Sequence, residues 1–188
     1  MSARDRATWN KRYLDLVNSP FPRPDLLLMD YTPPAAAVDA RALDLAGGRG
    51  QNGLWLAEQG YVVDIMDISR VALDSAREEM TRRGLRRVNL LDVDLDTMHL
   101  PAQTYDIVSV FRFFNRRLLP AIGRSVNPGG RLIYEAFSLH ILDERPNMNP
   151  DFCVQGDELA DAFPKWKIVL HSTEGVFARL VAIKPTGG

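Results

Sequence analysis

The chain has few of the features that mark secreted, membrane or nucleic-acid-binding proteins. Cys153 is the single cysteine among 188 residues, so an internal disulfide and a thiolate metal cluster are excluded. The 23 basic and 24 acidic side chains nearly cancel, which disfavours a role on nucleic acid or an anionic membrane. No apolar run approaches the roughly 20 residues that span a bilayer, and no apolar signal core follows Met1. We therefore expect a cytoplasmic protein without a metal.

The length fits one domain that can bury a substantial core, so we expect a single domain over residues 1–188. Apolar runs alternate between strand-like and helix-like segments from residue 41 onward, which predicts an α/β fold with a parallel sheet and helices on both faces. The predicted strands are 41–46, 61–66, 87–92, 105–111 and 130–137, and the predicted helices are 5–18, 26–29, 51–59, 69–83, 116–125 and 157–163.

Three local signals refine this pattern. Ser69 is typical of a helix N-cap, and Gly84 is typical of the residue that follows a helix. Residues 127–130, Asn-Pro-Gly-Gly, predict a tight turn that leads into the next strand. The strand-like runs 166–172 and 176–184 leave no room for a helix around Gly175, so they predict an antiparallel hairpin. We therefore expect a seven-stranded sheet in which only the last strand is antiparallel.

The segment from Arg41 to Asp67 is the most informative part of the chain. It predicts a buried strand, a glycine-rich turn, a helix and a second buried strand that ends in an acid. Glycines allow a backbone to approach a ligand closely, and the acid can accept hydrogen bonds from both ribose hydroxyls. The segment therefore predicts a site for an adenosine-bearing small molecule.

The spacing Gly48-x-Gly50-x-x-Gly53, with Asp67 beyond it, also matches the dinucleotide fingerprint. Three observations disfavour a dinucleotide. Asp44 near the tip of the first strand is of no use to a pyrophosphate, although it can order the turn or meet an ammonium group. The chain shows no second mononucleotide half, and the terminal hairpin is foreign to a dinucleotide domain. A phosphate-binding P-loop motif is absent from the sequence.

These residues resemble the small class I S-adenosylmethionine-dependent methyltransferases, in particular the tellurite-resistance and thiopurine methyltransferase-like branch. The resemblance extends over nearly the whole chain. It rests on segments 9–13, 42–50, 52–57, 60–61, 67–69, 92–95, 105–108, 128–130 and 134–137, together with the terminal hairpin. It implies a Rossmann-like class I fold with a lid segment over 1–34, a cofactor-binding core over 41–137, and a substrate loop and hairpin over 138–188.

The resemblance also implies a role for each matching residue. The turn residues would lie under the methionine part of S-adenosylmethionine, Asp67 would hold the ribose, and Ile68 would pack on the adenine. Asp94 and the Leu95 backbone would reach the adenine edge, and Val110 and Phe111 would lie beside the sulfonium. The implied cofactor-binding set is Trp9, Arg12, Tyr13, Asp44, Ala46, Gly47, Gly48, Gly50, Asn52, Asp67, Ile68, Asp94, Leu95, Val110 and Phe111.

Two turn positions depart from the family pattern. Ala46 stands where the family has its first glycine, and Gly47 stands where it usually has a cysteine. Because Ala46 adds a methyl group close to the ligand, we expect slightly weaker cofactor binding.

The acceptor side is less specific in the sequence. Arg112, Arg116 and Arg117 cluster at a predicted helix start, where positive charge opposes the helix dipole, so they either bind an anionic acceptor or are simply solvated. Glu135 and His140 are the candidates for a general base, if the reaction uses one. The absence of a convincing base favours a small acceptor that ionises easily or attacks through a lone pair. The segment from Arg145 to Pro150 predicts a loop near the site.

We weigh three functions. The first is methyl transfer from S-adenosylmethionine to a small-molecule acceptor, in which the cofactor carries the chemistry and the protein binds and orients. The second is a non-catalytic protein that binds S-adenosylmethionine or S-adenosylhomocysteine, because the fold alone does not prove turnover. The third is a NAD-type oxidoreductase. Titration of the protein with S-adenosylmethionine, S-adenosylhomocysteine and NAD distinguishes these three functions.

Overall fold

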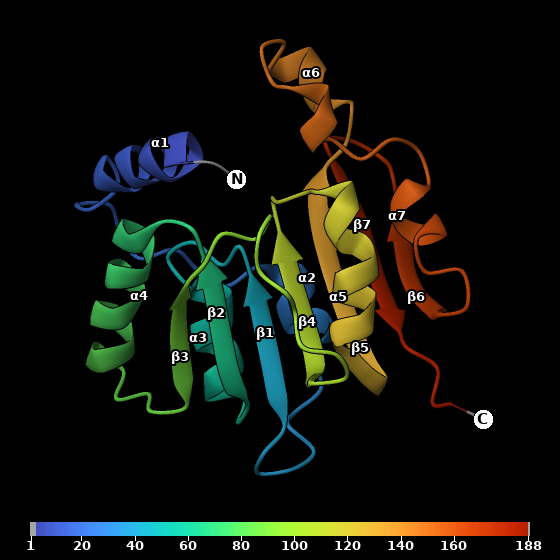
Figure 1. Ribbon diagram of the computed structural model, residues 1–188, viewed down its shortest axis with the longest axis horizontal. Coiled ribbons are helices and arrows are strands. Elements are labelled where there is room, and N and C mark those ends of the chain that lie inside the picture. Colours follow the sequence, from blue (N-terminus) through green and yellow to red (C-terminus); the bar gives the residue numbers. More distant parts are fainter. Residues whose placement is uncertain (1–2, 188) are drawn as a thin grey trace. The chain divides into compact units, whose positions relative to one another are not determined.

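A computed structural model describes residues 3–187 of the chain, which divides into two compact units, Met1–His99 and Leu100–Gly188. Within residues 3–187 no helix is long and apolar enough to cross a membrane. The first unit contains α1 (Ala3–Leu14), α2 (Leu26–Tyr31), β1 (Arg41–Leu45), α3 (Gln51–Glu58), β2 (Val62–Asp67), α4 (Arg70–Arg82) and β3 (Val88–Asp92), as labelled in Figure 1.

The sheet of the first unit is parallel and runs in the order β3-β2-β1. Strands β1 and β2 are buried along almost their whole length, as expected for parallel strands whose faces are both covered. Helix α3 contacts β1 and β2, whereas α4 contacts β2 and β3. Helix α1 packs on α4 (Figure 1), which brings the N-terminal helix into the same unit as the glycine turn.

Local signals set the ends of α4 as the sequence predicts. Ser69 has extended backbone angles, and its side chain accepts a hydrogen bond from the Ala72 amide. At the other end, Gly84 has a φ of 68°, a left-handed conformation that costs glycine little. The Leu85 amide donates to the Met80 carbonyl, 3.0 Å away, and so caps the last turn. Both predicted helix boundaries are confirmed.

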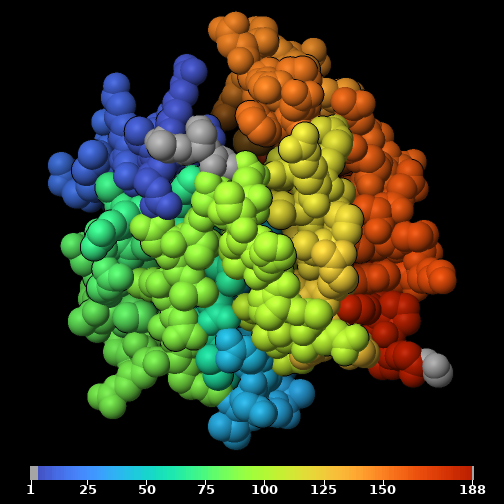
Figure 2. Space-filling view, viewed as in Figure 1, coloured from blue at the N-terminus to red at the C-terminus, as the bar shows by residue number. Residues whose placement is uncertain are grey.

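Within its described residues, 100–187, the second unit contains four strands, three short α-helices and two 3-10 turns. Its strands run in the order β4-β5-β7-β6. Helix α5 covers β4 and β5 (Figure 1), and the segment that carries α6 and η2 extends beyond the end of β5 (Figures 1 and 2). The elements are β4 (Tyr105–Phe111), η1 (Arg116–Leu118), α5 (Leu119–Ser125), β5 (Val126–Phe137), α6 (Ile141–Glu144), η2 (Pro150–Phe152), α7 (Glu158–Asp161), β6 (Lys167–Ser172) and β7 (Phe177–Ile183).

The predicted C-terminal hairpin is confirmed. Strand β7 is antiparallel both to β5 and to β6, and Gly175 in the turn between β6 and β7 has a φ of 72°. Strand β4 pairs with β5 in parallel. The described residues thus form a seven-stranded mixed sheet in which β7 is the antiparallel strand, the α/β architecture that the sequence predicts.

The expected tight turn at residues 127–130 was wrong. These residues lie inside one long strand, β5, which begins at Val126, and its register against β4 shifts between Tyr105 and Ile107. Gly129 has a φ of 78° and its amide donates to the Lys184 carbonyl, so the end of β7 holds the irregular segment in the sheet. The Lys184 Nζ also donates to the carbonyls of Gly123 and Val126.

The helix expected over 116–125 begins differently from the prediction. Its first turn is the 3-10 turn η1, and the α-helix starts only at Leu119. Asn115 caps η1, because its side-chain oxygen accepts from the Arg117 amide at 3.0 Å. An Asn side chain at this position competes for the amides of the first turn and favours a tighter start.

Candidate cofactor site

The turn between β1 and α3 has three left-handed residues. Gly48 and Gly50 have φ values of 56° and 80°, and Ala46 has a φ of 55°. A side chain at Gly48 would clash, because its Cβ would lie 2.4 Å from the Tyr13 hydroxyl oxygen. The left-handed conformation at Ala46 costs a residue with a Cβ roughly 1–2 kcal/mol. The turn therefore requires glycine at Gly48 and is strained at Ala46.

Asp67 closes the turn from the tip of β2. One carboxylate oxygen accepts from the Gly48 amide and the other from the Ser69 amide, each at 2.8 Å. The side chain is buried, and this burial raises the pKa of Asp67, although the amides of Ser69 and Gly48 favour the charged form. The two amides bind one oxygen each, so each oxygen keeps further lone-pair capacity for a ligand.

Asp44 orders the turn from the other side. Its Oδ2 atom accepts from the Gly53 amide at 2.9 Å, in the first turn of α3. A Cβ at Gly47 would lie 2.7 Å from the same oxygen, so a glycine at this position lets the carboxylate reach its partner. Of the two roles considered for Asp44, ordering of the turn has direct geometric support.

Asn52 has an unexpected partner. Its side-chain oxygen accepts from the Asp25 amide and its side-chain nitrogen donates to the Asp25 carboxylate, both at 2.9 Å. Asp25 is the residue before α2, so the pair ties the start of α2 to α3. Asn52 is buried, and this contact gives it a structural function that the sequence did not predict.

Helix α1 covers the turn within the first unit. Tyr13 approaches Gly48, the Trp9 and Tyr13 rings lie 6.1 Å apart, and the Arg12 guanidinium lies 5.1 Å from the centre of the Trp9 ring. Burial raises the pKa of Tyr13 far above its usual value, with the Asp67 carboxylate as a second cause. The structure thus brings Tyr13, Gly48 and Asp67 together, and places Trp9 and Arg12 beside them.

Two residues that the sequence did not single out hold α1 in place. Arg6 donates to the Ile68 carbonyl at 2.8 Å and pairs with Asp92, and the Asn10 side-chain oxygen accepts from the Ser69 hydroxyl at 2.8 Å. Ile68 and Ser69 follow β2 directly, and Asp92 is the last residue of β3. Amphipathic spacing identifies the helix, but no sequence signal identifies contacts across 59 to 86 residues.

The residues expected at the adenine edge lie in the loop after β3. In this loop Leu95 is buried and Asp94 is half-buried. Ile68, which follows β2, is buried as well. One Asp94 carboxylate oxygen accepts from the Asp96 amide at 2.9 Å, which shapes the loop. The Val93 amide donates to the Asp67 carbonyl at 3.0 Å, so this loop is joined directly to the tip of β2.

In the second unit, β4 ends in Val110 and Phe111, which are both buried. Arg112 follows with a left-handed φ of 56°, and its amide donates to the Glu135 carbonyl at 2.7 Å. Glu135 is buried on β5, where its carboxylate accepts from Arg179 at 2.8 Å and lies 3.9 Å from the Arg112 guanidinium. Glu135 is therefore held by two arginines.

The three arginines after β4 differ in their surroundings. Arg116 makes two hydrogen bonds to the Glu158 carboxylate, at 2.7 and 2.8 Å, and donates to the carbonyls of Asp151 and Cys153. Its guanidinium also lies 4.8 Å from the centre of the Phe114 ring. Arg117 is exposed. Arg116 thus holds residues 151–158 against the segment that leads into α5, and its side chain is not simply solvated.

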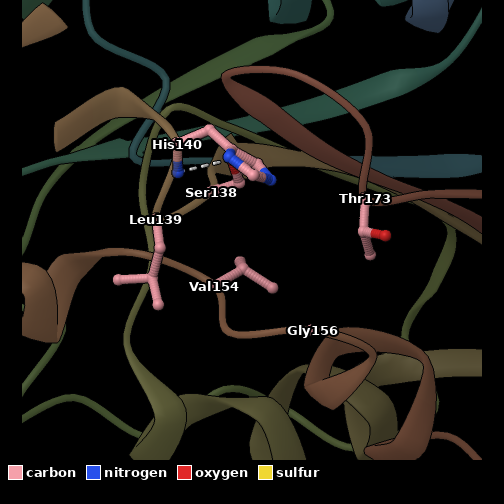
Figure 3. Close-up of a pocket in the computed structure, with 6 residues that line it drawn as sticks. All are labelled: Ser138, Leu139, His140, Val154, Gly156 and Thr173. Atoms are coloured by element: carbon pink, nitrogen blue, oxygen red, sulfur yellow. Dashed lines mark hydrogen bonds between the residues drawn. The ribbon is translucent and has the colours of Figure 1, made fainter. Parts of the chain in front are cut away.

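His140 lies at the edge of a hollow of about 240 Å³ in the second unit (Figure 3). The Ser138 hydroxyl donates to the Gly175 carbonyl at 2.6 Å and accepts from the His140 amide, so it joins the end of β5 to the hairpin turn. Val154 runs beside Ser138 as an isolated parallel bridge. The hollow is lined by Ser138, Leu139, His140, Val154, Gly156 and Thr173.

Comparison with known proteins supports the predicted class. Residues 42–130 match the family described as a methyltransferase domain, which places the glycine turn, Asp67 and the Asp94 loop inside it. Methyltransferases of this family take the methyl group from S-adenosylmethionine. The predicted likeness to class I S-adenosylmethionine-dependent methyltransferases is therefore confirmed by a family match over residues 42–130.

Individual relatives agree with this class. The chain is 38% identical over 85 residues to aklanonic acid methyltransferase DauC of Streptomyces sp. (strain C5), a match that covers 43% of this chain and 37% of that relative. The structure of an S-adenosylmethionine-dependent methyltransferase from Mesorhizobium loti matches this chain with a TM-score of 0.67 at 16% sequence identity. The match covers 84% of this chain and 95% of that chain. TehB from Haemophilus influenzae has a TM-score of 0.70 at 17% identity, with coverages of 94% and 67%. The two structures share the fold with this chain.

Proposed function

We propose that the chain transfers the methyl group of S-adenosylmethionine to a small-molecule acceptor. The observation that carries the proposal is Asp67, a buried carboxylate at the tip of a parallel strand, held by the Gly48 and Ser69 amides. Parallel α/β sheets bind ligands at this edge, and an acid there can accept from ribose hydroxyls. The left-handed Gly48 and Gly50 form a turn of the kind that admits a ligand close to the backbone.

The remaining cofactor contacts are part of the same proposal. Ala46, Gly47, Gly48 and Gly50 would lie under the methionine part, with Ile68, Asp94 and Leu95 around the adenine and Val110 and Phe111 beside the sulfonium. Trp9, Arg12 and Tyr13 would cover the ligand from α1. The approach of Tyr13 to Gly48 supports this lid role, as does the anchoring of α1 by Arg6 and Asn10.

The chemistry needs little from the protein beyond orientation. When bound, the cofactor supplies a methyl group already activated by the sulfonium. Alignment of the acceptor in a dry site supplies most of the acceleration. Because two arginines hold Glu135, we assign this carboxylate to the framework and leave His140 as the candidate base. Arg112, which also lies beside Glu135, and the exposed Arg117 remain candidates for an anionic acceptor, and Arg116 pairs with Glu158.

Calorimetry tests the proposal directly. We expect the protein to bind S-adenosylmethionine and S-adenosylhomocysteine and not NAD. A panel of small acceptors with labelled cofactor then tests methyl transfer. Binding without methyl release across a broad panel would favour the non-catalytic alternative, and binding of NAD alone would favour the oxidoreductase.

The acceptor side needs a separate test. Once an acceptor is known, Arg112→Ala and Arg117→Ala are expected to raise its KM and leave cofactor affinity unchanged, because guanidinium groups recognise carboxylates and oxyanions. If neither substitution changes the KM for the acceptor, we assign acceptor selection to residues 145–150 and to α1 instead. We also place the protein in the cytoplasm, a proposal that its single, buried Cys153 supports.

A further inference from the structure

Arg49 lies inside the glycine turn, between Gly48 and Gly50, at a position to which neither the resemblance nor the comparisons assign a role. We propose that Arg49 is a positioning residue that holds the connector between α1 and α2 (residues 15–25) and thereby keeps Tyr13 over the turn. The inference rests on the proposed binding of S-adenosylmethionine. It adds a link between the turn that would hold the cofactor and the helix that would cover it.

The guanidinium of Arg49 joins three parts of the first unit. Its Nε donates to the Ser75 hydroxyl on α4 at 3.1 Å. Its two terminal nitrogens donate to the carbonyls of Pro20 and Ser19, at 3.2 and 3.3 Å. A planar guanidinium can make several such bonds at once in a fixed geometry, which a lysine ammonium cannot reproduce. Arg49 therefore fixes the connector to both the turn and α4.

Phe21 strengthens the same attachment. Its ring lies 5.3 Å from the Arg49 guanidinium and 5.3 Å from the Arg83 guanidinium. A cation over an aromatic face is attracted by the negative face of the ring. The two arginines differ in their other bonds, because Arg83 donates to Glu79 and Glu58 whereas Arg49 donates to the connector and Ser75.

The connector begins directly after α1 with two successive hydrogen-bonded turns. The Ser19 amide donates to the Leu16 carbonyl at 2.9 Å, and the Leu16 amide donates to the Tyr13 carbonyl at 3.1 Å. Two consecutive turns thus join Tyr13 to the residue that Arg49 holds. Movement of Ser19 away from the turn would be transmitted to Tyr13, because these hydrogen bonds leave little slack between them.

The expected consequence is a change in the population of the closed lid. If α1 must cover the turn for tight binding, the apparent dissociation constant equals the intrinsic constant divided by the closed fraction. Loss of the Arg49 contacts that lowers the closed fraction to about one tenth weakens binding about tenfold. Arg49 touches the connector and not the ligand in this scheme, so it acts through Tyr13.

The experiment uses Arg49→Met, which keeps an unbranched stem, with S-adenosylhomocysteine as the probe. We expect calorimetry to show affinity about tenfold weaker than wild type. Limited trypsin digestion adds a readout of the lid, because α1 contains Arg4, Arg6, Lys11 and Arg12. Cleavage within α1 should accelerate in the free variant and return to the wild-type rate at saturating probe.

Two further variants make the result specific. Arg83→Met removes the other cation over Phe21 and should lower thermal stability while leaving probe affinity within about twofold of wild type. Ser75→Ala, at a half-buried position on α4, should fold normally and weaken binding about twofold to threefold. Wild-type affinity in Arg49→Met, or an equal loss in Arg83→Met, would overturn the inference. A wild-type protein that does not bind the probe would contradict the proposed function instead.

Discussion

Asp67 in the first unit and Glu135 in the second are both buried carboxylates, but different groups hold them in place. Backbone amides of Gly48 and Ser69 hold Asp67, and burial raises its pKa. Arg179 and Arg112 surround Glu135. One amide on each oxygen leaves a carboxylate with further acceptor capacity, whereas a guanidinium engages it in strong charge-assisted hydrogen bonds. The contrast supports the proposal that Asp67 accepts from a ligand, whereas Glu135 belongs to the framework of the second unit.

The largest expected effect follows from removing the presented acid. Asp67→Ala should weaken S-adenosylmethionine binding at least about tenfold, because a charged hydrogen-bond acceptor contributes more than about 1.5 kcal/mol. Calorimetry measures the change. Asp64→Ala is the matched control, because Asp64 is a second buried acid on β2 but pairs with Arg41 and Asn89. It should lower stability and leave affinity within about twofold; equal affinity of Asp67→Ala and wild type would remove Asp67 from the site.

The second unit should respond in stability and not in cofactor affinity. Arg116→Ala removes the double contact to Glu158 and the bonds to the carbonyls of Asp151 and Cys153. We expect a loss of about 1–1.5 kcal/mol, discounted because the pair is partly exposed to water. Hydrogen exchange should become faster in residues 150–158. Arg117→Ala, the exposed neighbour, should change stability by less than about 0.5 kcal/mol; an equal loss in both variants would contradict the structural role of Arg116.

Glu79 on α4 is another carboxylate that two arginines hold. Arg82 and Arg83 lower the pKa of Glu79 to about 2. Because the folded-state pKa is depressed, the stabilisation is present above the unfolded value near 4.5 and is lost as pH falls towards 2. Glu79→Gln should cost at most about 1 kcal/mol at pH 7, since Arg82 is solvated. Denaturant titrations at several pH values should show this difference vanish below about pH 2.

The smallest effect concerns the strained turn residue. Ala46→Gly removes a left-handed alanine that costs roughly 1–2 kcal/mol, but it adds roughly 0.5–1 kcal/mol of backbone entropy cost. We expect a stability gain of a few tenths of a kcal/mol and cofactor affinity that rises at most about twofold. Gly48→Ala, which places a Cβ against Tyr13, should act in the opposite direction. A stability loss in Ala46→Gly would show that the alanine is not strained.

Much of the fold was predictable because its signals are local. The buried runs that became β1 and β2, the Ser69 cap and the Gly84 stop depend on residues only a few positions apart. The hairpin followed from the missing helix around Gly175. The turn expected at 127–130 failed because Lys184, more than fifty residues further along, holds that segment inside β5. A turn sequence specifies a bend only where no neighbouring strand competes for its backbone.

The candidate site divides in the same way. The sequence alone determined the glycine turn, Asp67 at the strand tip and the family likeness, because these depend on residue type at short spacing. Only the tertiary structure decided that Asn52 pairs with Asp25, that Tyr13 approaches Gly48, and that Arg116 belongs to Glu158. These partners are separated by 27 to 42 residues. A side chain's chemistry names what it can bind, but which of several possible partners it meets depends on packing that brings distant segments together.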